Sequence, residues 1–222
     1  MANAEIKWSY SALKQYVNCP KQYYHLRVLK DVVQKVTPQM MYGTEIHKLI
    51  ENYLTKGSPL EDIYLKTTVD YIQSTLDGMR YVEHKMALDS TGAPVACDAD
   101  NYWVRGIADL IITDGDVAYC IDWKTGNDRY ADVKQLRLMS LMIFAHFPHI
   151  NKVESLLHFT KSGIPVVDKT HYRESHEELW AEFAPDLMKL QVSHDTNIWP
   201  MKPSNLCGWC AVVHCQNYRD RE

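Results

Sequence analysis

The sequence predicts one α/β domain in which a mixed central sheet is flanked by helices. Apolar residues recur at helical spacing within residues 1–78, and again over 132–147 and 177–192. Shorter apolar runs over 80–88, 102–113, 117–124, 152–160 and 165–172 are typical of strands. This order, with helices first and then strands interrupted by a helix, predicts helices packed on the faces of a sheet.

The helices have recognisable boundaries. Ser9 or Ser11 can cap the first one, and Pro20 divides it into two short helices that meet at Cys19-Pro20. Further helices are expected over about 43–53 and 59–78. Asp114-Gly115-Asp116 is a tight turn that joins two of the strands into a hairpin.

Composition limits the class of protein. The formal net charge is −4, with 24 Lys and Arg against 28 Asp and Glu, which excludes an evenly basic surface but not a local basic groove. No apolar run reaches the roughly 18–20 residues of a membrane helix, and the first residues do not resemble a signal peptide. We therefore expect no membrane partner and a cytoplasmic location.

Two acidic residues and a lysine dominate the predicted hairpin. Asp122 and Lys124 are two residues apart on one strand and so face the same side. Asp109, on the neighbouring strand, is expected to lie nearly opposite Asp122. Such a set is costly to bury without a cation, and Mg²⁺ or Mn²⁺ suits its hard oxygen ligands. The alternative is a surface salt bridge on a two-stranded ribbon.

The segments GIAD, ending at Asp109, and IDWKTG, containing Asp122 and Lys124, resemble the core of the RecB-like branch of the PD-(D/E)xK nucleases. The resemblance implies a restriction-endonuclease-like core. It also implies that His47, Asp109, Asp122 and the backbone carbonyl of Trp123 bind Mg²⁺ or Mn²⁺, and that Lys124 supports the attack of water on a phosphodiester.

Three further segments agree with the family in order. Gly43-Thr44-Glu45-Ile46-His47 resembles its G-x-x-x-H helix, and Glu83 lies on a strand before the acidic hairpin, as a glutamate does in the family. Gln135 matches the start of the family's Q-x-x-x-Y helix, where it implies a catalytic role in positioning substrate or lysine. Met139 stands where the family has tyrosine. Taken singly, each residue is more typical of a core or surface position.

Four cysteines form a second pattern. Cys207, Cys210 and Cys215 are crowded near the end of the chain, and Cys19 precedes a proline near its start. The same arrangement in AddB-type and CRISPR-associated adaptation nucleases implies a [4Fe–4S] cluster, with zinc as the rival occupant. Joining such distant segments predicts a structural role. Cys120 is expected to be a buried strand residue.

Basic and aromatic residues alternate between Lys14 and Lys30, among them Tyr16, Tyr23 and Tyr24. This pattern suits stacking on a single DNA strand, and equally a helix with an aromatic core face and a solvated basic face. By resemblance, the N-terminal helices cover the active site.

The leading hypothesis is a metal-dependent DNA exonuclease that acts mainly on single strands, in recombination, replication or repair of the phage or CRISPR type. Residues 1–78 would form a helical part, 79–175 the nuclease core, and 176–222 a helix with the iron–sulfur segment. No phosphate-binding helicase motif occurs, so a helicase, recombinase or other processing protein is the expected partner. The alternative is a non-catalytic module that binds DNA or protein.

Overall fold

The computed structural model describes residues 6–219, which form two compact units. The first unit contains residues 38–180 together with the described residues before Trp8. The second contains residues 8–37 and the chain from Ala181 onward. The helices between Thr37 and the first strand therefore group with the sheet and not with the first helices of the chain. The prediction of a single domain over residues 1–222 stays a prediction.

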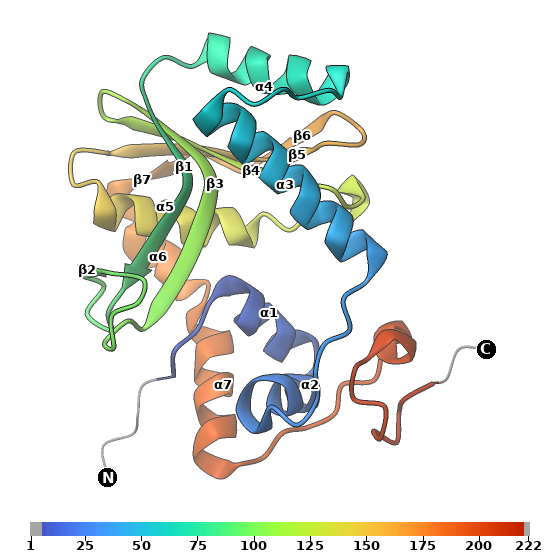
Figure 1. Ribbon diagram of the computed structural model, residues 1–222. Coiled ribbons are helices and arrows are strands. Elements are labelled where there is room, and N and C mark those ends of the chain that lie inside the picture. The colour runs from blue at the N-terminus through green and yellow to red at the C-terminus, as the bar shows by residue number, and fades with distance from the viewer. Residues whose placement is uncertain (1–5, 220–222) are drawn as a thin grey trace. The chain divides into compact units, whose positions relative to one another are not determined.

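A seven-stranded mixed sheet forms the centre of the first unit (Figure 1). Its strands run in the order β2-β1-β3-β4-β5-β6, and β7 pairs with β5. Only β4 and β5 are parallel, and the other pairs are antiparallel. This confirms the predicted fold class. The strands are β1 Met79–Leu88, β2 Pro94–Val95, β3 Val104–Asp114, β4 Val117–Lys124, β5 Lys152–Phe159, β6 Ile164–Val167 and β7 His171–Tyr172.

Helices cover both faces of this sheet (Figure 1). On one face lie α3 (Pro38–Lys56) and α4 (Ile63–Thr75), and Ile46 and Ile50 of α3 belong to the same buried cluster as Trp123 of β4. On the other face lies α5 (Lys134–His146), whose Leu136 packs with Leu157 and Phe159 of β5. The first unit also contains the short turns η2 Asp128–Tyr130 and η3 Arg173–Ser175, and most of α6 (His176–Ala181).

Helix α3 begins five residues earlier than the sequence pattern suggested. Pro38 occupies its first position, where a missing N–H costs nothing. Gly43, the predicted start of the helix, lies inside it. A Cβ at Gly43 would stand 3.1 Å from Oγ1 of Thr125, so the glycine permits a close approach of the helix to the residue after β4.

The second unit is helical. Its elements are α1 (Tyr10–Asn18), α2 (Pro20–Tyr23), the π-helical turn η1 (Tyr24–Leu29), α7 (Ala184–Thr196) and the 3₁₀ turn η4 (Asn205–Trp209). Ser9 caps α1 by accepting a hydrogen bond from the backbone N–H of Ala12 at 3.3 Å. The two N-terminal helices meet at Cys19-Pro20, as the sequence predicted. None of the helices in the described part of the chain has the length and apolarity of a membrane span.

Two elements that the sequence pattern made continuous are divided. The strand expected over 165–172 is interrupted by Asp168, whose buried carboxylate accepts hydrogen bonds from Arg137 at 3.1 Å and faces His171 at 3.0 Å. The helix expected over 177–192 becomes α6 and α7. Pro185 lies in the first turn of α7, because a proline inside one continuous helix would clash with the preceding turn.

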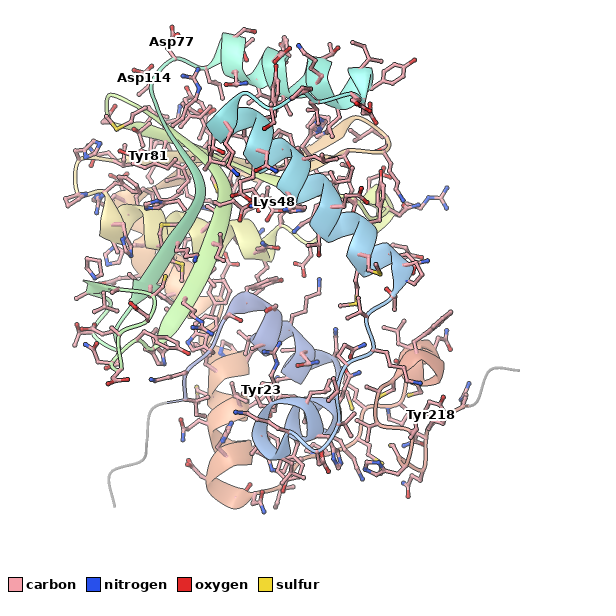
Figure 2. The ribbon with its side chains drawn as sticks, viewed as in Figure 1. Tyr23, Lys48, Asp77, Tyr81, Asp114 and Tyr218 are labelled. Atoms are coloured by element: carbon pink, nitrogen blue, oxygen red, sulfur yellow. The ribbon has the colours of Figure 1, made fainter. Side chains whose placement is uncertain are left out.

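Gly78 gives a direct test of the β1–β3 junction, which Asp77 and Asp114 mark in Figure 2. Its φ is +126°, and a Cβ there would lie 2.1 Å from the carbonyl oxygen of Thr113. We expect Gly78→Ala to lower the free energy of unfolding by about 3 kcal/mol, since backbone strain and overlap add. Gly57→Ala is the control, because Gly57 also has a positive φ of +66° but nothing within 4 Å. Urea unfolding should give a loss of only about 1 kcal/mol for it; equal losses would contradict the close approach.

Candidate active site

Backbone pairing between β3 and β4 ends just before the two aspartates of the motif. The last paired residues of β3 and β4 are Leu110 and Ile121, so Asp109 and Asp122 are the next residues along the two strands. In place of a further ladder bond, Oδ2 of Asp109 accepts a hydrogen bond of 2.7 Å from the backbone N–H of Trp123. Asp109 is only 8% exposed. The carboxylate therefore substitutes for a backbone acceptor and is held in place by it.

His47 approaches this carboxylate from α3. Its Nδ1 lies 3.3 Å from Oδ1 of Asp109. The hydrogen bond to Asp109 raises the pKa of His47, burial works against this rise, and the charges of Asp109, Asp122 and Glu83 add to it. The position therefore favours a cation, either a protonated imidazole or a metal ion bound to the neutral ring.

Glu83 of β1 completes the group with a strained backbone. Its φ is +50°, a left-handed conformation that is uncommon for a residue with a side chain. Pairing of β1 with β3 continues on both sides, at Val82–Leu110 and His84–Ala108, but no pair forms between Glu83 and Asp109. Burial, and then the charge of Asp109, raise the pKa of Glu83. The strained backbone marks Glu83 as a candidate functional residue, and the charge of Asp109 beside it favours a cation at this position.

The three side chains of His47, Glu83 and Asp109 can act on one ion. Each offers one ligand atom, and these atoms lie within 4.8 Å of one another. His47 and Glu83 also line one open pocket with Lys48, the next residue of α3, which Figure 2 labels. One nitrogen and two hard oxygen donors suit a divalent cation such as Mg²⁺ or Mn²⁺.

Asp122, Lys124 and Gln135 form a closed ring of contacts beside this group. Lys124 Nζ lies 2.5 Å from Oδ2 of Asp122 and donates to Oε1 of Gln135 at 3.0 Å. Gln135, from the start of α5, in turn donates from Nε2 to Oδ1 of Asp122 at 2.7 Å. Burial and the nearby charge of Asp109 raise the pKa of Asp122 to about 6, with Lys124 acting in the opposite direction.

The site is thus assembled from both faces of the sheet. His47 of α3 reaches Asp109, and Gln135 of α5 reaches Asp122. Both carboxylates lie just beyond the last β3–β4 pair, which joins Leu110 to Ile121. The link between Gln135 and Asp122 was not foreseen from the sequence, which relates Gln135 only to the lysine or substrate. Likewise, nothing in the sequence marks the strain at Glu83, since glutamate is an ordinary residue on a strand.

Met139 stands where the family pattern has tyrosine, and it makes an apolar contact there. It is buried, and a Cβ on Gly106 of β3 would come 2.5 Å from its methyl carbon. Met139 therefore packs against the bare backbone of Gly106 and brings no hydroxyl to the site.

The four cysteines surround one cavity in the second unit, with a volume of about 220 Å³. Its cysteines are Cys19, Cys207, Cys210 and Cys215. Gln22 donates to Sγ of Cys210 at 3.4 Å, and the backbone N–H of Ser204 donates to Sγ of Cys207 at 3.3 Å. The backbone N–H of Tyr218, which Figure 2 labels, donates to the carbonyl oxygen of Cys215 at 2.8 Å. Burial raises the pKa of Cys210, and the neighbouring Cys19 and Cys215 raise it further.

The remaining two cysteines belong to the first unit and do not line this cavity. Cys120 is 1% exposed on β4, as the sequence predicted. Cys97 is half-buried and lies in the segment that connects β2 to β3.

The aromatic residues of the N-terminal helices pack inward. Tyr16 and Tyr23 are 5% and 4% exposed, and the hydroxyl of Tyr16 donates to the carbonyl of Lys189 at 2.7 Å. Trp199 stacks on Tyr23 and on Tyr24, with ring centroids 5.9 and 5.0 Å apart. Of the two interpretations of this segment, the structure favours an aromatic core face for Tyr16 and Tyr23.

The fold and this arrangement define a nuclease. A sequence model of the PD-(D/E)XK nuclease superfamily matches residues 7–215, and the chain belongs to this superfamily. Its members typically use Mg²⁺ or Mn²⁺ and cleave DNA, which agrees with the acidic group of His47, Glu83 and Asp109. A comparison with curated proteins finds no match.

Two solved structures are similar to the chain at low identity. SSO0001 has a TM-score of 0.42 and 13% identity, covering 99% of this chain and 90% of that one. A "Putative exonuclease" from Eubacterium rectale has a TM-score of 0.48 and 11% identity, covering 94% of each chain. At these scores neither bears on the activity.

Glu83 permits a test of stored strain. We expect Glu83→Gly to be more stable than Glu83→Gln by about 1 kcal/mol in urea unfolding without divalent metal, because only glycine relieves the positive φ. Both variants remove the repulsion with Asp109, so the difference isolates the backbone. Equal stability of the two variants would contradict strain at this position.

Proposed function

We propose that this chain is a metal-dependent DNA exonuclease that acts mainly on single strands and carries a structural iron–sulfur cluster. The nuclease activity follows from the family; the exonucleolytic mode, the single-strand preference and the cluster are the proposal. The metal-dependent cleavage has one main support: His47, Glu83 and Asp109 converge beside the ring of Asp122, Lys124 and Gln135.

The donor set fits the metal that the family implies. By resemblance, His47, Asp109, Asp122 and the backbone carbonyl of Trp123 would hold Mg²⁺ or Mn²⁺. The ligand atoms of His47, Glu83 and Asp109 lie within 4.8 Å of one another, which supports Glu83 as a further ligand. When bound, such an ion makes water a stronger nucleophile at neutral pH and offsets the negative charge of the phosphodiester. The strained, repelling carboxylates of Glu83 and Asp109 fit this need for positive charge.

The protein's own residues would prepare the hydrolysis. Lys124 supplies a fixed positive charge for the phosphate and orients the attacking water, because Asp122 and Gln135 hold its ammonium group from two sides. The water oxygen forms a bond to phosphorus and loses a proton to solvent, while the bond from phosphorus to one sugar oxygen breaks. That departing oxygen gains a proton from solvent, so the net reaction adds one water across the bond. Gln135 positions Lys124 and Asp122 and need not touch the substrate.

The preference for single strands rests on resemblance, whereas surface charge supports the binding of DNA as such. Lys14, Arg27 and Lys30 of the second unit are exposed, and such residues can contact a phosphate backbone. The chain has no helicase motif, so a separate helicase, recombinase or other processing protein would supply the single strand. The pathway would be recombination, replication or repair, in a phage or CRISPR setting.

The cysteine cavity fits a polynuclear cluster. Four thiols line one cavity of about 220 Å³. Among the described residues, no three of these sulfurs lie within 4.8 Å of one another. Around one zinc ion, four sulfurs stand at about 2.3 Å from a single point. In a cubane cluster each thiolate binds a different iron, so the sulfurs stand farther apart. Such a cluster would join Cys19 to the three C-terminal cysteines.

Lys124 is the test of the catalytic proposal. We expect Lys124→Ala to reduce cleavage of labelled single-stranded DNA in Mg²⁺ or Mn²⁺ by about 100-fold or more, since it removes the fixed charge at the phosphate. Lys152→Ala is the matched control, because Lys152 also pairs at 2.5 Å with a carboxylate two residues away on a strand.

Substrates labelled at either end would show the mode of cutting in the same assay. Release of single nucleotides from an end supports an exonuclease, whereas internal fragments would replace that part of the proposal by an endonuclease. Full activity in Lys124→Ala, with folding checked by circular dichroism, would sink the mechanism.

The cluster has its own experiment. We expect the purified protein to be brown and Cys210→Ala to lose its visible absorption and bound iron. Its stability should fall by roughly 3–5 kcal/mol, because the cross-link between distant segments is lost. Cys97→Ala, outside the cavity, should keep both colour and stability. A colourless protein that contains zinc would contradict the iron–sulfur assignment.

A further inference from the structure

A second group of metal-ligating side chains lies in the helical unit, apart from the cysteine cavity's lining. It consists of His25, Asp31 and His214, each of which offers one ligand atom within 4.8 Å of the others. The sequence pattern did not single out any of the three. All belong to the same compact unit, so their grouping does not depend on how the two units are placed.

The backbone brings His25 and Asp31 together in an unusual way. His25 lies in the π-helical turn η1, a rare conformation that is often found at functional sites. The turn ends at Lys30, whose φ of 56° and ψ of 29° are left-handed and reverse the chain. Both carboxylate oxygens of Asp31 thereby reach Nδ1 of His25, at 3.0 and 3.1 Å.

His214 comes from the other end of the sequence. Its ring meets that of His25 edge to face, with centroids 4.8 Å apart and planes at 78°. His25 is 9% exposed, whereas Asp31 and His214 are exposed and leave the group open to solvent. An ion could therefore enter without unfolding the unit.

We propose that His25, Asp31 and His214 bind a divalent transition-metal ion of the zinc type. Two imidazoles favour zinc, cobalt or nickel over magnesium or calcium, and the carboxylate supplies a third ligand. The three side chains leave a coordination position for solvent. The inference is independent of the proposed nuclease mechanism, because none of its residues belongs to that site.

The ion would brace the segments that carry the cysteines. His25 lies six residues after Cys19, and His214 directly precedes Cys215. A bond from each histidine to one ion would join the π-helical turn to the C-terminal segment beside the cavity. Because an ion that binds only the folded state stabilises it, zinc should raise the melting temperature of the full chain.

The experiment uses the full chain as purified, titrated with Zn²⁺ by calorimetry and studied by X-ray absorption at the zinc edge. We expect one zinc per chain with only nitrogen and oxygen ligands, at about 2.0–2.1 Å. A sulfur shell at about 2.3 Å would place the zinc on the cysteines and overturn the proposal. The zinc edge reports on zinc even when the protein also contains iron.

Variants then locate the ion. His214→Gln should weaken zinc binding by about 10-fold or more and abolish the rise in melting temperature. His25→Gln should do the same, although its buried position makes the exposed His214 the better test of binding without loss of fold. His47→Gln is the control for zinc at the nuclease site. This variant should still bind one zinc ion as tightly as the unaltered chain. Retention in His214→Gln, or loss in His47→Gln, would overturn the assignment.

Discussion

The hydrogen bond from the backbone N–H of Trp123 to the carboxylate of Asp109 is the contact on which the nuclease site depends. It forms where the pairing of β3 and β4 ends at Leu110 and Ile121. A buried N–H without a partner would be costly, and a buried carboxylate without donors would be costlier still. Each satisfies the other, so the strands can separate at this point and leave room for side chains from both faces.

Separation of the strands explains why the site draws on so many elements. Helix α3 contributes His47, whose neighbour Ile46 packs in the core against the sheet, and α5 contributes Gln135 from the opposite face. The helices are positioned by apolar contacts, and their polar residues meet at the gap. Fixed dipoles and charges that need no rearrangement are the main means by which such a site stabilises developing charge.

The site carries energetic costs in its backbone and in the burial of its carboxylates. Glu83 has a left-handed backbone, and its carboxylate faces that of Asp109. The buried Asp122 has a pKa raised to about 6, although Lys124 lies beside it. A fold selected for stability alone would place an apolar residue or a glycine at such positions. In the helical unit, too, polar groups stand where stability alone would favour apolar residues. Four thiols line one cavity there, and His25 and His214 lie close together.

By itself the sequence determined the mixed α/β fold, the place of Asp109, Asp122 and Lys124 on adjacent strands, and the family. These follow from local rules: alternation along a strand, the turn at Gly115, and the spacing of motif residues. It also brought Cys19 into consideration with the three C-terminal cysteines, by resemblance. Local patterns failed at Pro38, Asp168 and Pro185, where contacts or proline geometry overrode periodicity.

Only the tertiary structure decided the strain at Glu83, the double contact of Gln135, the inward packing of Tyr16 and Tyr23, and the meeting of His25 with His214. The physical reason is common to all four. Each depends on distances between residues that are remote in sequence, or on a backbone angle that the neighbouring strand or turn imposes. Residue identity and spacing contain no record of either.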